Sequence, residues 1–306
     1  MPQPWELILE VPTADLLGEG VVWDEASGAF LWTDILGRRL HQYDLAQKRL
    51  TTVPLPGRLC SFGLTSQAGM LIAAFDREIG WLEAGTGTFT PLLLPDLPPG
   101  VRLNDGRVGS DGAFWVGSMV EDAVLAGGDD LGRLYRFSPC GQLTVHIDGI
   151  CISNGLCWSP QGRRLYHADS LRGRVSAYPF DLSTGDLGEG ALLIASISGG
   201  SPDGATTDQD GRYYSALWEG WAVGIFSSEG ESEGRIDVPA SRVTCVAFGG
   251  RDLDLLAVTT ARVDLSEDQR ASEPRAGSLF IYKSPRKGVP ERRFAGRAPT
   301  SSELGG

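Results

Sequence analysis

The chain has 306 residues and a formal net charge of -12 at pH 7, because 39 acidic side chains outnumber 27 basic ones. This charge repels phosphate backbones and anionic lipid surfaces, which argues against nucleic acid and membranes as partners. The sequence has no apolar run approaching about 18 residues, and its N-terminus lacks a basic segment followed by a long apolar one. We therefore predict a soluble, cytoplasmic monomer or small homo-oligomer that acts on a small molecule.

A unit of roughly 45 residues recurs along the chain, a length typical of repeat folds. Each copy has a polar turn ending in glycine, then residues of alternating polarity, then a second turn and a short aromatic-rich strand. The first copy is "WDEASGAFLWTDILGRRLHQYDL", from Trp23 to Leu45, and the last copy is the most degenerate. The turn glycines of successive units are Gly28, Gly69, Gly112, Gly162, Gly211 and Gly250.

Stretches such as "AFLWTDI" and "RLYHAD" alternate with period two and predict β-strands. Four short strands with their turns fill each unit, which is the size of a β-propeller blade, whereas sandwiches and β-helices have shorter units. We predict an all-β, six-bladed β-propeller over residues 1–293 and a disordered tail over 294–306. The strand in "WELILEV" is expected to join the last blade and close the ring.

Most units carry an Xaa-Gly pair at the start of an apolar strand, six to eight residues before the turn glycine. In four units the residue before this glycine is polar, and the second unit has Phe62 instead. The chain contains only two asparagines, and both fall in this region. The four polar residues are Glu19, Asp105, Asn154 and Asp203.

These four side chains are expected to converge, because the innermost strand of every propeller blade lines the central axis. Converging carboxylates repel one another, raise their pKa values or recruit a cation. Oxygen ligands without a thiolate or imidazole favour Ca²⁺, Mg²⁺ or Mn²⁺, and they also accept Zn²⁺ or Fe(II). The alternative is that each pair is a tight turn, since Asn-Gly and Asp-Gly are common turn dipeptides. A turn does not, however, call for Glu19 before Gly20.

Other catalytic signatures are missing from the sequence. It has no GxSxG, no HExxH and no GxGxxG between a strand and a helix, and its three histidines lie far apart. These absences argue against a serine hydrolase, a zinc protease and a dinucleotide-dependent enzyme.

From about Leu17 to about Lys283 the chain resembles the family of senescence marker protein-30, gluconolactonases and sugar lactonases. The resemblance rests on "GEGVVWD", "RLNDGRVGSDGAFWVGSM", "ISNGLCWSP", "SPDGATTDQDG" and "VTCVAFGG". It implies a six-bladed propeller with one central catalytic divalent metal, held by Glu19, Asn154 and Asp203. It also implies contacts to sugar hydroxyls from Arg102, Asn104 and Glu121, with Asp105 as a supporting or further polar contact.

The resemblance implies hydrolysis of a sugar lactone to its aldonic acid in oxidative sugar catabolism. Our hypothesis is that the metal binds the lactone carbonyl while Asp203 takes a proton from the attacking water. A metal-dependent esterase or phosphotriesterase on the same site, and a non-enzymatic metal-binding propeller, are the alternatives. The sequence leaves open the lactone and the metal, which is Ca²⁺, Zn²⁺, Mg²⁺, Mn²⁺ or Fe(II).

The stretch "ALWEGWAVGIF" departs from the family pattern, in which a small polar stretch is common at this place. It carries Trp218, Glu219 and Trp221. Tryptophans near the site either stack on a sugar face or pack within the blade, and the sequence does not separate these two roles.

Overall fold

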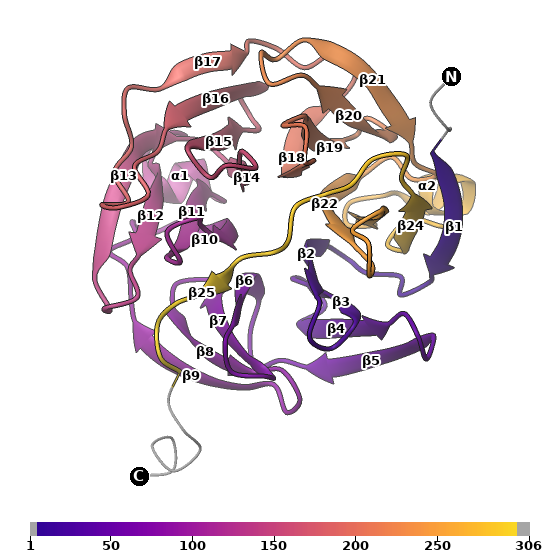
Figure 1. The fold of residues 1–306 in the computed structure, drawn as a ribbon, viewed down its shortest axis with the longest axis horizontal. Coiled ribbons are helices and arrows are strands. Elements are labelled where there is room, and N and C mark those ends of the chain that lie inside the picture. Colours follow the sequence, from indigo (N-terminus) through magenta and orange to yellow (C-terminus); the bar gives the residue numbers. More distant parts are fainter. Residues whose placement is uncertain (1–4, 299–306) are drawn as a thin grey trace.

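The structure is a computed structural model in which residues 5–298 are described. Six sheets surround a central axis as the blades of a propeller (Figure 1). Each blade has four antiparallel strands, and the second blade carries a fifth. The predicted all-β, six-bladed β-propeller is therefore confirmed. Among residues 5–298, no helix is long and apolar enough to cross a membrane.

The first three blades follow chain order from the axis outward. Blade 1 contains β2 (Gly18–Asp24), β3 (Ala29–Asp34), β4 (Arg39–Asp44) and β5 (Arg49–Pro54). Blade 2 contains β6 (Leu59–Thr65), β7 (Met70–Phe75), β8 (Ile79–Glu83) and β9 (Thr88–Leu93). Blade 3 contains β10 (Val101–Val108), β11 (Phe114–Val120), β12 (Gly132–Phe137) and β13 (Leu143–Ile150).

The next two blades repeat this order. Blade 4 contains β14 (Ser153–Trp158), β15 (Arg164–Asp169), β16 (Arg174–Pro179) and β17 (Ala191–Ile194). Blade 5 contains β18 (Ser201–Thr207), β19 (Tyr213–Trp218), β20 (Ala222–Phe226) and β21 (Ser232–Asp237). Two short helices lie in loops, α1 (Ala123–Ala126) after β11 and α2 (Glu267–Ser272) in blade 6.

Blade 6 is built from both ends of the chain. It contains β22 (Val243–Gly249), β23 (Leu255–Thr260), β24 (Leu279–Lys283) and, on the outside, β1 (Glu6–Val11). β1 pairs antiparallel with β24, so the N-terminal strand closes the ring as predicted. Closure leaves no gap between the last blade and the first, and so avoids the exposed sheet edges of an open array.

The predicted turn glycines mark the hairpins between the first and second strands of the blades. All six have a positive φ, between 66° and 90°, which L side chains rarely adopt. The repeat seen in the sequence is therefore a repeat of one backbone turn.

Apolar side chains gather between neighbouring blades rather than at one centre. Six buried clusters are present, and each is formed by two adjacent blades. Between blades 3 and 4, for example, Trp115, Trp158 and Phe180 meet edge to face. Successive residues of a strand point to opposite faces, so each sheet packs against both neighbours. This packing holds the inner strands rigidly around the axis.

Residues 284–298, which we name the C-terminal strap, cross the centre of the ring in the view of Figure 1. Within the strap, β25 (Arg293–Phe294) pairs in parallel with β6. Phe294 is 2% exposed and joins the cluster between blades 2 and 3. The tail predicted from residue 294 is therefore wrong for residues 294–298, which belong to the fold. The rest of that tail, residues 299–306, lies outside the described residues.

The strap covers the end of the channel where the inner strands finish. Arg107, near the end of β10, forms a bidentate ion pair with Glu291 of the strap, with the shortest N–O distance at 2.7 Å. Arg293 pairs with Asp24 and donates to the Thr65 carbonyl at 2.8 Å, and these are the last residues of β2 and β6. The opposite end, where the inner strands begin, is free of the strap.

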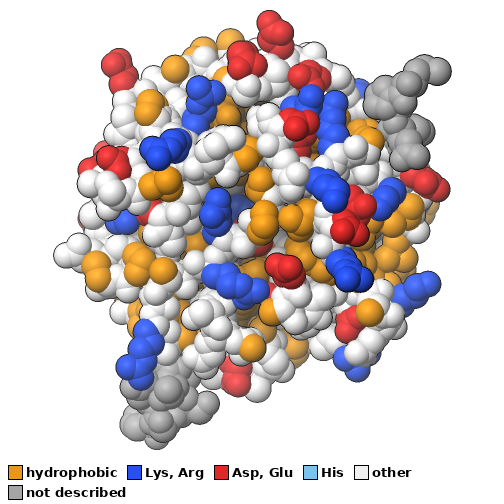
Figure 2. All heavy atoms as spheres, in the orientation of Figure 1, with side chains coloured by type: hydrophobic (Ala, Val, Ile, Leu, Met, Phe, Trp, Pro, Cys, Tyr) orange, Lys and Arg blue, Asp and Glu red, His pale blue; other side chains and the backbone are white. Residues whose placement is uncertain are grey.

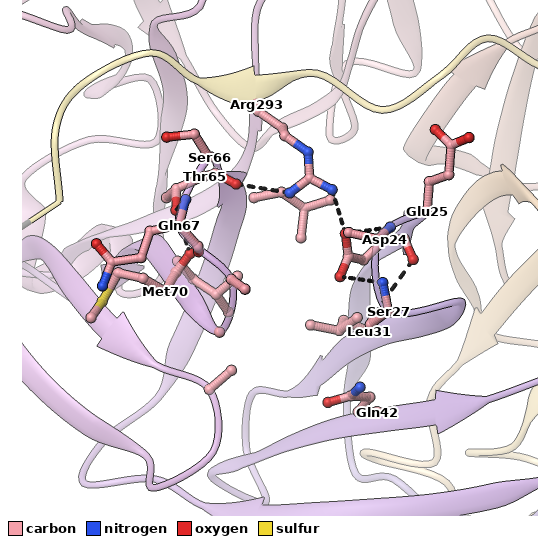
Figure 3. A pocket seen from close by; sticks show the side chains of 16 residues that line it. Asp24, Glu25, Ser27, Leu31, Gln42, Thr65, Ser66, Gln67, Met70 and Arg293 are labelled. Atoms are coloured by element: carbon pink, nitrogen blue, oxygen red, sulfur yellow. Dashed lines mark hydrogen bonds and ion pairs between the residues drawn. The ribbon is translucent and has the colours of Figure 1, made fainter. Parts of the chain in front are cut away.

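A pocket of about 480 Å³ lies beside the strap, between blades 1 and 2 (Figure 3). Arg293 reaches across it from the strap, between Thr65 and Asp24. Asp24 also accepts a hydrogen bond from the backbone N–H of Ser27 at 3.2 Å. The predicted site residues do not line this pocket, and the half-buried carboxylate of Asp24 already has partners, so the pocket does not have the chemistry of the predicted site.

Candidate metal centre

The three predicted metal ligands lie where inner strands begin, at the channel end opposite the strap. Glu19 is the second residue of β2, Asn154 the second of β14, and Asp203 the third of β18. Inner strands of a propeller line the same axis, so residues at equal depth in different blades approach one another. Blades 1, 4 and 5 thus bring together side chains that are far apart in the sequence.

Every inner strand has an irregular pairing at this depth. In the four strands with polar residues, the register with the neighbouring strand shifts after Glu19, Leu103, Asn154 and Pro202. The inner strands of blades 2 and 6 are interrupted at the same level. A β-bulge leaves a residue unpaired and re-aims its side chain, and bulges are frequent beside active sites. The interruption turns these polar groups away from regular sheet alternation.

The Asn154-Gly155 pair is part of a strand and not a turn. Both residues lie within β14, and Gly155 has φ +62° at the bulge. A Cβ atom on Gly155 would stand 2.5 Å from the hydroxyl of Tyr213, so this position also needs glycine for space. The interpretation of this pair as a hairpin turn is therefore wrong.

A pocket of about 380 Å³ opens at this end of the channel. Five of the six predicted site residues line it, and the exception is Glu121. Its walls combine polar and apolar groups, as small-molecule sites commonly do. The lining residues are Leu17, Glu19, Arg102, Asn104, Met119, Ile152, Asn154, Ser170, Leu171, Ser201, Asp203, Trp218 and Glu219.

The carboxylates at the site perturb one another. Burial, and next the nearby charge of Asp105, raise the pKa of Glu19 to about 8. Burial, then Glu19, then Asp105 raise the pKa of Asp203 well above its usual range. In the absence of a cation, Glu19 therefore holds its proton at neutral pH. A cation between these groups would offset the repulsion and restore the charged forms.

The donor set fits a hard divalent cation. Asp203 is 6% exposed, and its Oδ1 atom has no hydrogen-bond partner within residues 5–298. A buried carboxylate oxygen without a partner is costly, and a metal ion is one way to satisfy it. Over the same residues, no group of three or more His, Cys, Asp or Glu side chains is arranged to hold a metal. The candidate set instead joins two carboxylates to the neutral amide oxygen of Asn154.

A chain of hydrogen bonds fixes the orientation of the Asn154 amide. Its Nδ2 donates to the hydroxyl of Ser170 at 2.8 Å, and Ser170 donates to the Pro202 carbonyl at 2.6 Å. Its Oδ1 accepts from Nδ2 of Asn104 at 3.0 Å. An amide oxygen has two lone pairs, so one remains for a cation.

Asn104 supports Asn154 more than it faces the pocket. Its Nδ2 donates to Oδ1 of Asn154 and to the Ser153 carbonyl, both at 3.0 Å, and its Oδ1 accepts from Nη1 of Arg102 at 2.8 Å. Both amide hydrogens are thus used inside the protein. For the predicted contact with a sugar hydroxyl, Asn104 has only its second oxygen lone pair.

Glu121 lies beside the pocket rather than in its wall. It accepts hydrogen bonds from Nε of Arg102 at 3.0 Å and from Arg58 at 2.7 Å. Its predicted contact with a sugar hydroxyl would compete with these two guanidinium groups. Within Arg102, Nε donates to Glu121, and Nη1 donates to the Leu103 carbonyl and to Asn104. Nη2 is therefore the nitrogen of Arg102 that can face a ligand.

Two neighbours of the ligands complete the site. Asp105 accepts from the backbone N–H of Leu156 at 3.0 Å, which links blade 3 to blade 4, and burial raises its pKa. Ser170, which orients Asn154, was missed by the sequence reasoning. It stands in a polar turn without a distinctive motif, and only the pairing of Ser153 with Asp169 in the hairpin brings it near Asn154.

Comparison with known proteins identifies relatives along almost the whole chain. The model of the family described as "SMP-30/Gluconolactonase/LRE-like region" matches residues 17–262. The 6-deoxy-6-sulfogluconolactonase of Pseudomonas putida is 35% identical over 286 residues, covering 92% of this chain and 96% of the relative. The L-arabinolactonase of Azospirillum brasilense is 32% identical over 291 residues, covering 93% and 94%.

Solved structures are similar over the same extent. A calcium-binding protein, regucalcin, from Agrobacterium tumefaciens strain C58 superposes with a TM-score of 0.87 at 33% identity, covering 94% of this chain and 97% of that one. A luciferin-regenerating enzyme has a TM-score of 0.85 at 27% identity, with coverage of 95% and 98%.

Proposed function

The chain belongs to the SMP-30/gluconolactonase/LRE-like family, and we propose that it is a sugar lactonase that hydrolyses an aldonolactone to its aldonic acid. Relatives named as sugar lactonases, matched over more than nine-tenths of the chain, support lactone hydrolysis in sugar metabolism. One observation carries the proposal. Asp203, whose Oδ1 has no hydrogen-bond partner within residues 5–298, lines the same pocket as Glu19 and Asn154.

Glu19, Asn154 and Asp203 would hold one divalent metal. Bound there, the metal would act as a Lewis acid on the lactone carbonyl. The all-oxygen donor set suits Ca²⁺, Mg²⁺ or Mn²⁺, and the solved neighbour described as calcium-binding supports Ca²⁺ among the candidates. Zn²⁺ and Fe(II) remain in the set to be tested.

Asp203 is the proposed general base. One oxygen of its carboxylate would hold the metal and the other would accept a proton from the attacking water, because no hydrogen-bond donor competes for Oδ1 within the described part of the chain. The water oxygen then bonds to the carbonyl carbon, the bond from that carbon to the ring oxygen breaks, and Asp203 returns the proton to the ring oxygen. The products are a free hydroxyl and a carboxylic acid, so the atoms balance.

The remaining walls position the substrate. Nη2 of Arg102 and the second lone pair of Asn104 face a ring hydroxyl as donor and acceptor. Leu17, Met119 and Ile152 give the pocket an apolar side that limits water around the reacting bond. Holding the lactone in one orientation converts a loose encounter into a positioned attack.

The direct test uses the full chain stripped of metal by a chelator. Each of the five candidate metals is added singly, and acid release is followed for pentonolactones, hexonolactones and a phosphotriester. We expect metal-dependent hydrolysis of a lactone faster than the spontaneous reaction. A preference for the phosphotriester would favour the related esterase activity, and no hydrolysis of any compound would favour a non-enzymatic propeller.

A further inference from the structure

The turn between β19 and β20 forms one wall of the site pocket. Trp218 and Glu219 both line the pocket. Trp218 is the cross-strand partner of Ser201, which stands two residues before Asp203 on the neighbouring strand. The departure noticed in the sequence therefore lies beside the candidate base and not in the core of the blade.

Arg242, which immediately precedes β22, supports this wall from behind. Its guanidinium carbon lies 5.0 Å from the centre of the Trp218 ring, and its Nη2 lies 3.7 Å from a carboxylate oxygen of Glu219. Arg242 is 8% exposed, and over residues 5–298 its Nε and Nη1 atoms have no hydrogen-bond partner. Its Nη2 also donates to the Asp264 carbonyl at 3.4 Å, so the indole, the carboxylate and this one long hydrogen bond together place the cation.

The backbone of the turn is held in an unusual conformation. Glu219 has φ +60° and Trp221 has φ +57°, in the left-handed region that non-glycine residues seldom adopt. The turn is kept there by the hydrogen bond from Gly220 N–H to the Leu217 carbonyl at 2.9 Å and by Val238 N–H to the Trp221 carbonyl at 2.8 Å. Local strain of this kind persists where the surroundings enforce it, and it clusters at functional sites.

We propose that Trp218 and Glu219 form the specificity wall of the lactone pocket, which selects a neutral, polyhydroxylated lactone over one with an anionic substituent. Arg242 covers one face of the indole, so the rest of the ring is the surface offered to the C–H groups of the sugar. The Glu219 carboxylate accepts a hydrogen bond from a substrate hydroxyl. Arg242 is a positioning residue that holds both groups.

The charge pattern of the pocket gives the selectivity its direction. Glu219 is the carboxylate of the pocket that is left to face the substrate, because Glu19 and Asp203 would hold the metal and Arg102 is paired with Glu121. A sulfonate or phosphate on the sugar would meet Glu219 directly, whereas a hydroxyl would donate to it. Arg242 offsets this charge only in part, because its Nη2 lies 3.7 Å from the Glu219 carboxylate, which is 66% exposed to solvent, and Arg242 itself is not among the residues that line the pocket.

The inference rests on the proposed lactonase function, and its test measures kcat and KM separately on the metal-loaded enzyme. The substrates are a neutral lactone, glucono-1,5-lactone, and an anionic one, 6-phosphogluconolactone. We expect Trp218→Ala to raise KM for the neutral lactone about tenfold and to change kcat by less than about threefold, with Trp218→Phe restoring most of the loss. Arg242→Met should raise KM less, and Arg242→Lys should recover part of it.

Trp221→Ala is the matched control, because Trp221 belongs to the same turn but does not line the pocket. It should leave both constants within about twofold. Glu219→Gln should narrow the preference for the neutral lactone by about tenfold, since it removes the charge but keeps the shape. Equal KM values for the Trp218→Ala and Trp221→Ala variants, or an unchanged preference in Glu219→Gln, would overturn the specificity wall.

A binding measurement separates this inference from the proposed function. Calorimetry with 1,5-anhydroglucitol, a neutral ring without a carbonyl, reports on the wall alone. If no lactone is hydrolysed but this ring binds to wild type and to Trp221→Ala, and binds less well to Trp218→Ala, the activity fails and the wall stands. Hydrolysis with equal binding in all three proteins would reject the wall and keep the activity.

Discussion

The two ends of the central channel are made by the same inner strands, yet they treat buried charge in opposite ways. At the strap end, Arg107 and Glu291 form a bidentate pair, and both side chains are only 12% exposed. At the other end, two buried carboxyl groups, Glu19 and Asp203, lie close together with raised pKa values, and an oxygen of Asp203 has no partner in the described chain. Figure 2, which views the face crossed by the strap, shows basic and acidic side chains interspersed there.

This difference in how buried charges are partnered indicates which end of a symmetric scaffold carries the chemistry. In a buried ion pair, each charge is offset by its partner, so no ligand is required and the pair is interpreted as structural. A cluster of buried carboxylates without counter-charge costs stability, and such a cluster persists when a ligand relieves it. Substitutions at the two ends of the channel should therefore differ in their effects on activity, metal affinity and stability.

The largest effect is expected at the open end. Replacing Asp203 with Ala removes the candidate base and one candidate ligand together. We expect kcat/KM for the lactone to fall by about 10³-fold or more in the presence of metal. Initial rates of acid release measure this, and Asp210→Ala, an exposed carboxylate of the same blade, is the control. Near-full activity of the Asp203→Ala protein would contradict the assigned role.

At the closed end, the expected effect is on stability. Glu291→Gln leaves Arg107 buried without its counter-charge, and we expect the free energy of unfolding to drop by about 3 kcal/mol. Urea denaturation at neutral pH measures it, with the exposed Glu229→Gln as control. The folded fraction should keep the catalytic constants of the wild type, because the strap does not reach the metal centre. A loss of activity without a loss of stability would mean that the two ends are coupled.

Asn154→Ala tests whether the amide is a ligand. The variant loses the neutral oxygen and releases Ser170, and we expect metal affinity to fall on the order of 100-fold. The free energy of unfolding of the metal-free protein should fall by only about 1 to 2 kcal/mol, since Asn104 and Ser170 each lose one hydrogen bond but keep their bonds to the Ser153 and Pro202 carbonyls. Metal titration calorimetry and urea denaturation of the same sample give the two values. The reverse pattern would make Asn154 a structural residue.

A pH series on the metal-free protein probes the free energy that the protonation of Glu19 contributes. The pKa of Glu19 is raised from 4.5 to about 8, so the folded state keeps a proton that the unfolded state releases between these values. Stability should therefore fall as pH rises through this window, by up to about 1.4 kcal/mol per unit for this group. Thermal unfolding midpoints from pH 5 to 8 measure the slope. Saturating metal should flatten it, and an identical slope with metal would place the cation elsewhere.

Much of the fold could be predicted because each repeat contains a turn whose backbone conformation requires a particular residue type. A turn that needs positive φ selects glycine, and Gly28 and its counterparts therefore mark the blades in the sequence. The convergence of Glu19, Asn154 and Asp203 in one pocket could be predicted because the three residues occupy one repeat position. The closing role of β1 followed from the need to leave no open edge.

The remaining features depend on contacts that have no local pattern. Phe294 lies in a polar stretch, and its burial is decided by blades 2 and 3, so the sequence pattern predicts a tail from residue 294 onward. Glu121 was assigned to the substrate, yet Arg58 from another blade competes for its carboxylate. The bulges are equally hidden, because they appear only as a mismatch between two paired strands.

The pairing of β1 with β24 also constrains the order in which the protein folds during translation. Residues 6–11 leave the ribosome long before their partner, residues 279–283. The outer strand of blade 6 therefore waits, unpaired, through most of translation, and so long-range a contact forms slowly. Blades 1, 4 and 5 can fold before β1 pairs with β24. The ring that sets the distances between these blades is closed only by that pairing. The metal centre is therefore expected to bind its metal only when β1 has paired with β24, so metal uptake would report that blade 6 is complete.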